Sequence, residues 1–278
     1  MKAFGLTLRI AGGTLALMAL QALWSHPRNR AELCLSVIPG LLVVLALGLV
    51  AASSRQQGWK LSGTLFVLYF GINQLNTLDE ALLFKVGLKA THVLHMMATG
   101  FLNSLVFSPL LVLILGCWKK APQEDLRPLM PRSAADWVGR IMLGDLLYIL
   151  CYDVAGILTF HFVKDFYTGI KPPGPGSILE MEIFRGFIYV AAGLAVAHGM
   201  KGQRTRAAMA LGLSFPILAG VAPLLLPNPF LPDYVRLAHG FEIGISNFVY
   251  GILLGHLLTR KAAPTTDEQQ AGSTESIR

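Results

Sequence analysis

Charged residues are scarce in this chain of 278 residues: they make up 14% of the sequence, against 54% hydrophobic residues. A soluble domain carries about 25% charged residues, so an ordinary soluble fold is excluded. Cysteine is also rare, and Cys34, Cys117 and Cys151 have no paired spacing. A disulfide framework and a thiolate metal site are therefore not expected. The mean hydropathy of +0.56 indicates an integral membrane protein.

Apolar runs of about 20 residues, the length that crosses a bilayer, recur along the chain. They predict an all-α fold, a polytopic integral membrane protein with about eight transmembrane helices in one bundle. The expected helices cover residues 3–24, 33–53, 61–83, 92–118, 134–160, 178–199, 205–226 and 237–258. They form one transmembrane helical domain over residues 1–260, and the polar segment 261–278 is expected to be a disordered cytoplasmic tail. No internal repeat is evident in the sequence.

The net charge of +7 comes from short basic clusters between the apolar runs, which is not the pattern of a nucleic-acid-binding protein. Lysine and arginine are more numerous on one flank of the predicted helices, as the positive-inside rule requires of the cytoplasmic side. The pattern predicts a multi-pass protein of the cell (inner or plasma) membrane with cytoplasmic N- and C-termini. The lipid bilayer is its expected surrounding, and no nucleic-acid partner is expected.

Seven ionisable residues are expected at one edge of the membrane, the outer one: Glu80, His92, His95, Glu180, Glu182, His239 and Glu242. Ionisable groups at this depth are costly and commonly mark a functional site. Polar stripes at helical spacing continue this cluster and predict an interior cavity between four helices. The residues predicted to line it are Asn73, Asn76, Asp145, Tyr148, Tyr152, Asp153, Glu182, Ser246 and Asn247.

The residues predicted to hold a metal ion are Glu80, His92, His95, His239 and Glu242. His92 and His95 stand at i, i+3, which points two imidazoles the same way, and Zn²⁺ is the expected ion. His239 and Glu242 have, in reverse order, the spacing that di-metal helix bundles use. Two alternatives stay open: an interfacial position for the histidines, and haem ligation by His239 with His92 or His95, although no haem-specific motif is present.

The run EMEIFRGF, from Glu180 to Phe187, resembles the E-E-x-x-F-R-G signature of the CAAX-protease and bacteriocin-processing (CPBP) family. Those proteins are polytopic helical membrane proteins, many of them intramembrane glutamate/histidine proteases. The resemblance implies catalytic roles for Glu180 and Arg185, and for His239 on the last helix. Met181 replaces the second glutamate, the seventh predicted helix has no histidine, and Ile243 stands where the last family motif has Asn or Asp.

Two mechanisms use these residues. In the first, a membrane-embedded hydrolase cleaves a membrane peptide or lipid: Glu180 is the general base, Arg185 orients it or pairs with Glu182, and His239 stabilises the oxyanion. In the second, a proton-coupled small-molecule transporter, Glu80 or Glu242 exchanges a proton, since burial favours the neutral carboxyl. Inverted repeats and broken helices would favour the transporter. The sequence favours the hydrolase, and a non-catalytic membrane subunit is a third alternative.

Overall fold

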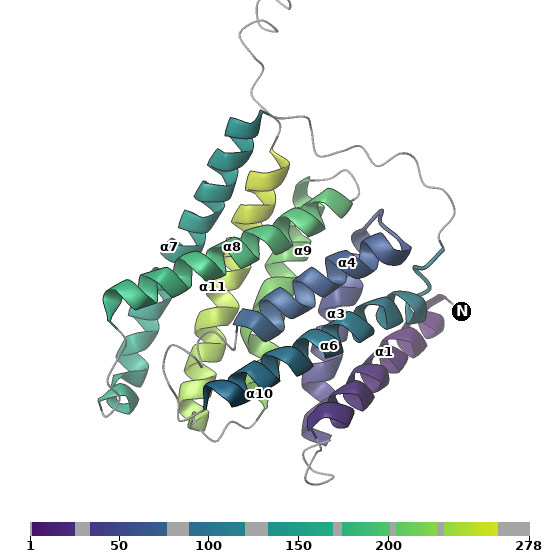
Figure 1. Cartoon of the computed structure of the whole chain (residues 1–278), viewed down its shortest axis with the longest axis horizontal. Coiled ribbons are helices and arrows are strands. Elements are labelled where there is room, and N and C mark those ends of the chain that lie inside the picture. The colour runs from purple at the N-terminus through teal and green to yellow at the C-terminus, as the bar shows by residue number, and fades with distance from the viewer. Residues whose placement is uncertain are drawn as a thin grey trace, which may run out of the picture.

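The computed structural model describes residues 2–25, 34–76, 89–119, 133–168, 174–200, 204–226 and 231–260. Within these ranges the chain is all-α, as predicted, and its helical elements fall into eight runs at the predicted places (Figure 1). The elements are α1 (Lys2–Ser25), α3 (Val37–Ser53), α4 (Gly58–Leu68), η1 (Tyr69–Leu75), α6 (Ala90–Ile114), α7 (Ala134–Tyr167), α8 (Pro175–Gly199), α9 (Arg204–Pro216), η2 (Ile217–Val221), α10 (Ala222–Leu225) and α11 (Asp233–Thr259).

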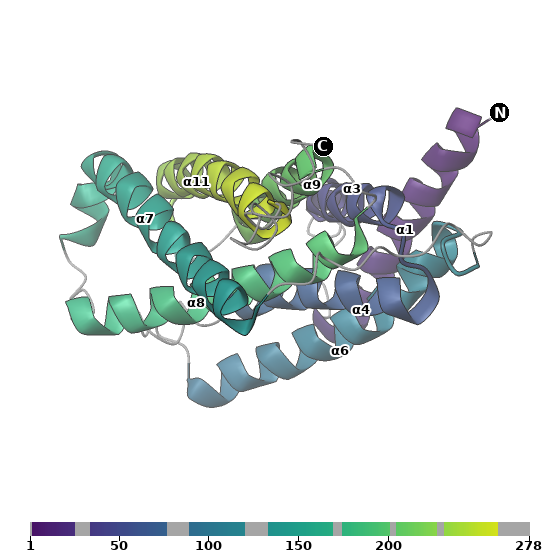
Figure 2. The same ribbon diagram turned by 90° about the horizontal axis from the view of Figure 1, so that it is seen from above.

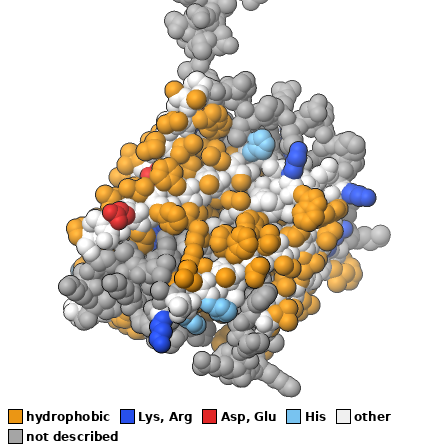
Figure 3. All heavy atoms as spheres, in the orientation of Figure 1, with side chains coloured by type: hydrophobic (Ala, Val, Ile, Leu, Met, Phe, Trp, Pro, Cys, Tyr) orange, Lys and Arg blue, Asp and Glu red, His pale blue; other side chains and the backbone are white. Residues whose placement is uncertain are grey.

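Five of the described helices are long and apolar enough to cross a membrane: Phe4–Leu23, Thr91–Ile114, Ala134–Tyr167, Arg204–Leu225 and Asp233–Thr259. Val37–Ser53 is a shorter apolar helix. Apolar side chains cover much of the surface in Figure 3, and charged ones are sparse on that face. On α7, Ile157 and Phe162 are 75% and 74% exposed. Such a surface suits contact with lipid rather than water.

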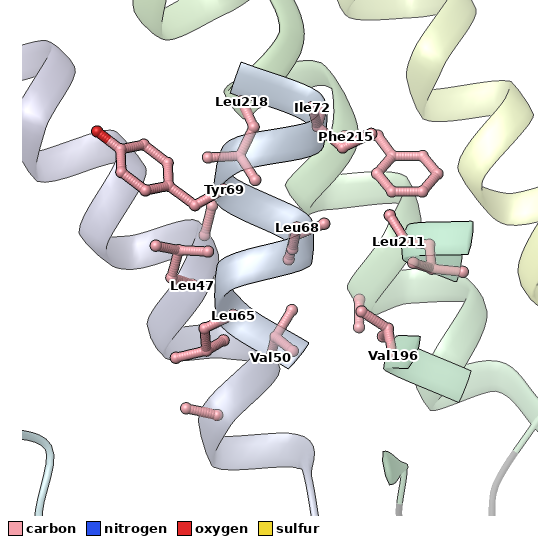
Figure 4. Close-up of a cluster of buried hydrophobic side chains, with 14 of the residues drawn as sticks. Leu47, Val50, Leu65, Leu68, Tyr69, Ile72, Val196, Leu211, Phe215 and Leu218 are labelled. Carbon is pink, nitrogen blue, oxygen red and sulfur yellow. The ribbon is translucent and has the colours of Figure 1, made fainter. Parts of the chain in front are cut away.

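The core lies between α3, α4, η1, α8, α9 and η2, whose apolar side chains meet at the centre of the bundle (Figure 4). Leu65 and Leu68 of α4 are fully buried there, opposite Leu211 and Phe215 of α9. In a bilayer, lipid tails are as apolar as these residues, so close packing rather than exclusion of water holds the helices together.

The packing of the first four helical runs recurs in the last four. Within each set the first helix packs on the second and the fourth: α1 on α3 and α6, and α7 on α8 and α11. Between the sets, α3 packs on α9 and η2, just as α8 packs on α4 and η1. The links that precede α4 and α9 meet in an antiparallel bridge between Ser54 and Met200. Residues 2–119 and 133–260 are therefore two repeats of one arrangement, related by a pseudo-two-fold axis (Figure 2).

The same arginine contact occurs in both repeats. Arg9 Nη1 donates to the Leu115 carbonyl oxygen at 2.7 Å, and Arg140 Nη1 donates to the Leu257 carbonyl oxygen. Each arginine ties the first helix of its repeat to the end of the last one. A charged donor also suits this place, since cations are favourable at a helix C-terminus.

A glycine follows each arginine at the same spacing, in Arg9–Gly13 and Arg140–Gly144. A Cβ at Gly13 would lie 3.0 Å from Leu111 of α6 and 3.0 Å from Val44 of α3. A Cβ at Gly144 would meet Leu254 of α11 at 3.0 Å and Val190 of α8 at 2.9 Å, which is the matching pair of helices. The glycine contacts match the helices of the two repeats to within one residue of the arginine contacts, and they correct the expectation that the chain has no internal repeat.

Both repeats interrupt their third helical run with a π-helix, η1 in one and η2 in the other. π-Helical turns are rare and occur frequently at functional sites. The two segments contact each other, and Asn73 Nδ2 donates to the Leu218 carbonyl oxygen at 2.8 Å. The predicted stripe of Asn73, Asn76 and Glu80 assumed an uninterrupted α-helix; η1 turns Asn73 toward η2, and Glu80 lies outside the described residues.

The repeat predicts paired effects of mutation. We expect Arg9→Gln and Arg140→Gln each to destabilise the protein by about 1.5–3 kcal/mol, the range for a hydrogen bond to a charged group. Arg140→Gln should cost more, because Arg140 Nε also donates to Asp136 at 2.9 Å. Thermal unfolding in detergent measures both, with Arg204→Gln, at an exposed position, as the control. A loss confined to one of the two arginines would contradict equivalent roles.

Candidate functional site

The buried charged residues among those described all lie in the C-terminal repeat, on α7 and α8. Asp145, Glu182, Arg185 and Asn247 are all at most 7% exposed. A buried polar group must find partners or carry a free-energy cost, so the contacts of these side chains indicate what the site can do.

The end of the bundle where α11 begins holds a hydrogen-bonded chain of three side chains. His239 and Glu242 stand at i, i+3 on one face of α11, and His239 Nδ1 lies 2.7 Å from Glu242 Oε2. The other ring nitrogen, Nε2, lies 3.0 Å from the Tyr167 hydroxyl of α7. An ionised carboxylate only accepts, so Nδ1 donates to Glu242, and in the neutral ring Nε2 then accepts from Tyr167. Glu242 thus fixes the tautomer and orientation of His239.

Further along the same face of α11, Ser246 and Asn247 bond to the helix backbone. Ser246 Oγ donates to the Glu242 carbonyl oxygen at 2.7 Å, and Asn247 Nδ2 donates to that of Ile243 at 3.0 Å. Both residues line a small cavity between α7 and α11 of about 10 Å³, roughly the room of one water molecule. The cavity is lined by Tyr148, Cys151, Tyr152, Ser246, Asn247 and Tyr250.

Aromatic rings and a carboxyl lie beyond this cavity, deeper in the bundle. The ring of Tyr148 stacks on that of Tyr189 at 4.7 Å and meets Tyr250 edge-on at 5.4 Å. Asp145 stands one turn before Tyr148 on α7 and faces Gly186 of α8, where an added Cβ would lie 2.1 Å from Asp145 Oδ1. The predicted stripe of Asp145, Tyr148 and Tyr152 therefore does face the protein interior.

Glu182 and Arg185 form the ion pair that their i, i+3 spacing predicts. Arg185 Nη1 lies 3.6 Å from Glu182 Oε1, and Arg185 Nη2 donates to the Asn76 carbonyl oxygen at 2.8 Å. The guanidinium therefore joins α8 of one repeat to the end of η1 of the other. This contact places Glu182, Arg185 and Asn76 at the interface between the repeats.

The predicted catalytic residues have different surroundings. Glu180 is exposed on α8, whereas Arg185 is buried against Asn76 and His239 is held by Tyr167 and Glu242. Among the predicted metal ligands, His92 and His95 are exposed at the start of α6, and Glu80 lies outside the described residues. No group of three His, Cys, Asp or Glu side chains placed to hold a metal ion occurs in the described part of the chain. Of the predicted cavity residues, Asp153 is exposed.

Three tyrosines of this region were not predicted: Tyr167, Tyr189 and Tyr250. Tyr250 follows His239 by 11 residues, which is three helical turns, so extending the α11 stripe would have found it. Tyr167 lies beyond residue 160, where the predicted helix ended, while α7 continues to Tyr167. Tyr189 follows Glu182 and Arg185 at i+7 and i+4, so extending the face of that pair along α8 would have found it. All three cysteines are free, and Cys34 is exposed.

No protein-family model matches the chain, and a comparison with curated proteins and with solved structures finds no significant match.

Proposed function

We propose that the protein is a proton-coupled carrier of small molecules whose eight helical runs all cross the membrane. The observation that carries this proposal is a series of polar side chains along the α7–α11 interface, from Tyr167, His239 and Glu242 at one end to Asp145 in the interior. Such groups within a membrane are costly, and they mark ion and proton pathways. We call these residues the polar path: Tyr167, His239, Glu242, Ser246, Asn247, Tyr152, Tyr250, Tyr148 and Asp145.

The repeat architecture supports transport. Many carriers consist of repeats related by an axis along the membrane normal, and their binding sites lie at the repeat interface, where helices are discontinuous. Here the two π-helices meet at that interface, and Arg185 reaches across it to Asn76. We therefore place the substrate beside η1, η2 and the Glu182–Arg185 pair, where a change in repeat packing would open or close access.

His239 and Glu242, at the end of the bundle where α11 begins, each have a role in proton exchange. Glu242 is 8% exposed and His239 is 23% exposed, so the histidine has the readier access to water. A proton taken up by His239 leaves an imidazolium beside the Glu242 carboxylate, which stabilises the charged ring. Glu242 and His239 together therefore hold one exchangeable proton at the entrance of the polar path.

The test is uptake by purified protein in sealed vesicles, with an imposed proton gradient and a defined mixture of amino acids, sugars, nucleosides and organic acids. Mass spectrometry measures what accumulates inside. We expect at least one compound to accumulate only with the gradient, and Glu242→Gln to reduce its rate about 100-fold, as for loss of a positioned proton-transfer group. Asp153→Asn, at an exposed position of α7, is the matched control and should transport normally. Accumulation without a gradient, or none at all, would contradict the proposal.

A membrane hydrolase is the second candidate, favoured by the orientation of His239. A histidine held by a carboxylate through Nδ1 and hydrogen-bonded to a hydroxyl through Nε2, as His239 is to Tyr167, has the orientation of a general base. With Glu180 as the base of the CPBP-like segment, the substrate would be a membrane peptide or lipid. Fluorogenic peptides and lipids in the same vesicles test this candidate: cleavage that Glu180→Gln and His239→Gln both abolish would favour the hydrolase over the carrier.

A further inference from the structure

We infer that Asp145, beside the small cavity of the C-terminal repeat, is a proton-binding site, and that the N-terminal repeat has no carboxyl at the matching position. The inference deepens the proposed function, on which its role in coupling rests. The existence of the site does not depend on that role, because it follows from the surroundings of Asp145 and from comparison of the repeats.

The first observation is the state of the Asp145 carboxyl. Its side chain is 5% exposed, and Oδ1 receives no hydrogen bond. The charged and titratable groups around Asp145 and its neighbours Tyr148 and Tyr250 are Glu182, Arg185 and Tyr189 of α8 and Cys151 and Tyr152 of α7. Arg185 pairs with Glu182 and with Asn76, so its charge is directed elsewhere. A buried carboxyl in such surroundings becomes stable by binding a proton, which removes its charge.

Comparison with the N-terminal repeat shows that the fold does not need a carboxyl at this position. The Arg–Gly alignment pairs Asp145 with Thr14 and Tyr148 with Leu17. Thr14 is buried but satisfies its own hydroxyl by donating to the Ile10 carbonyl oxygen at 3.0 Å, and Leu17 is fully buried. Asp145 and Tyr148 therefore occupy positions where the N-terminal repeat has a hydroxyl hydrogen-bonded to its own helix and an alkyl side chain.

On the facing helix the repeats differ at one position, whereas Asn103 and Ser104 of α6, which match Ser246 and Asn247, are buried with an oxygen that has no hydrogen bond. The contact of Gly13 with Leu111 and of Gly144 with Leu254 pairs Phe107 of α6 with Tyr250 of α11. Phe107 is fully buried and packs against the ring of Tyr69 at 5.7 Å, with no hydroxyl of its own. Tyr250 is equally buried but has a hydroxyl without a hydrogen-bond partner, and it lines the cavity.

The cavity supplies the missing partners. Asn247 Oδ1, like the Tyr250 hydroxyl, is buried without a hydrogen bond, and both residues line a space of about one water molecule. Buried polar atoms of this kind are commonly satisfied by an ordered water. We place a water there, where it can bond to the Tyr250 hydroxyl and to Asn247 Oδ1.

The test is infrared difference spectroscopy of the purified full-length protein in detergent, which detects the carbonyl stretch of a protonated carboxyl. We expect a band that shifts in D₂O, disappears in Asp145→Asn and in Asp145→Thr, and persists in Asp153→Asn. The threonine variant introduces the residue of the other repeat, whose place in the fold the structure already shows, and Asp145→Asn keeps the volume if the threonine variant does not fold.

Two results would overturn the proton site. One is a spectrum of folded Asp145→Asn that keeps every protonated-carboxyl band. The other is loss of the band when Na⁺ is added at constant pH, which would make the ligand a metal cation. Proton-driven uptake that is unchanged in Asp145→Asn in the vesicle assay would overturn the role of the site in coupling. If the band depends on Asp145 but no compound accumulates in vesicles, the proton site stands and the carrier function fails.

Discussion

Replacing Arg185 by alanine is expected to destabilise the protein by about 3–5 kcal/mol, the range for removing one partner of a buried ion pair. The side chains of Arg185 and Glu182 are 4% and 1% exposed, so Glu182 would lose its cation in surroundings that solvate a carboxylate poorly. The same substitution removes the hydrogen bond from Nη2 to Asn76, which joins α8 to the end of η1. Both repeats therefore lose a contact.

Unfolding of purified Arg185→Ala in mixed micelles measures this loss. The double variant Arg185→Gln, Glu182→Gln is the matched comparison, because it removes both charges and keeps hydrogen-bonding groups of similar length. We expect the double variant to regain a large part of the lost stability, since replacing both partners avoids an uncompensated buried charge. A single variant as stable as the native protein would show that the pair does not hold the repeats together.

Replacing Gly255 by valine is expected to have the second large effect, because it separates α9 and α11, whose backbones approach closely at this glycine. A Cβ at Gly255 of α11 would lie 2.4 Å from Ala208 Cα of α9, and one at Gly251 would lie 2.6 Å from the Leu211 carbonyl carbon. The obstructing atoms are backbone, so no rotamer change relieves the clash. Small residues at i, i+4 let membrane helices approach closely, and their loss removes the packing that holds those helices together.

We expect Gly255→Val to lower the free energy of unfolding by at least about 3 kcal/mol, at or above the upper end for overpacking a well-filled interior. Thermal unfolding and the yield of monodisperse protein after solubilisation measure the loss. Gly240→Val is the matched control on the same helix, because nothing lies within 4 Å of a Cβ at Gly240. Equal stability of the two valine variants would contradict the close approach of α9 and α11.

The local features of the fold were predictable from the sequence. Helix positions follow from the lengths of the apolar runs, and the Glu182–Arg185 pair follows from i, i+3 spacing. The bond between His239 and Glu242 likewise joins neighbours on one helix face. The end of α7 was misplaced because Lys164 and Asp165 interrupt its apolar pattern, although the helix continues past them to Tyr167. Boundary errors of this kind arise where polar residues continue a helix beyond its apolar part.

The contacts between helices could not be predicted from the sequence and became known only from the tertiary structure. The sequence by itself determined that the chain is helical and apolar, and which side chains share a helix face, because both depend on residues within a few positions of each other. It did not reveal the repeat, because the two copies share packing contacts, such as those of Arg9 and Arg140, rather than a continuous run of identical residues. The cavity beside Asp145 likewise could not be predicted. It depends on the distances between α7, α8 and α11, which are set by glycines and ring contacts between residues far apart in the sequence.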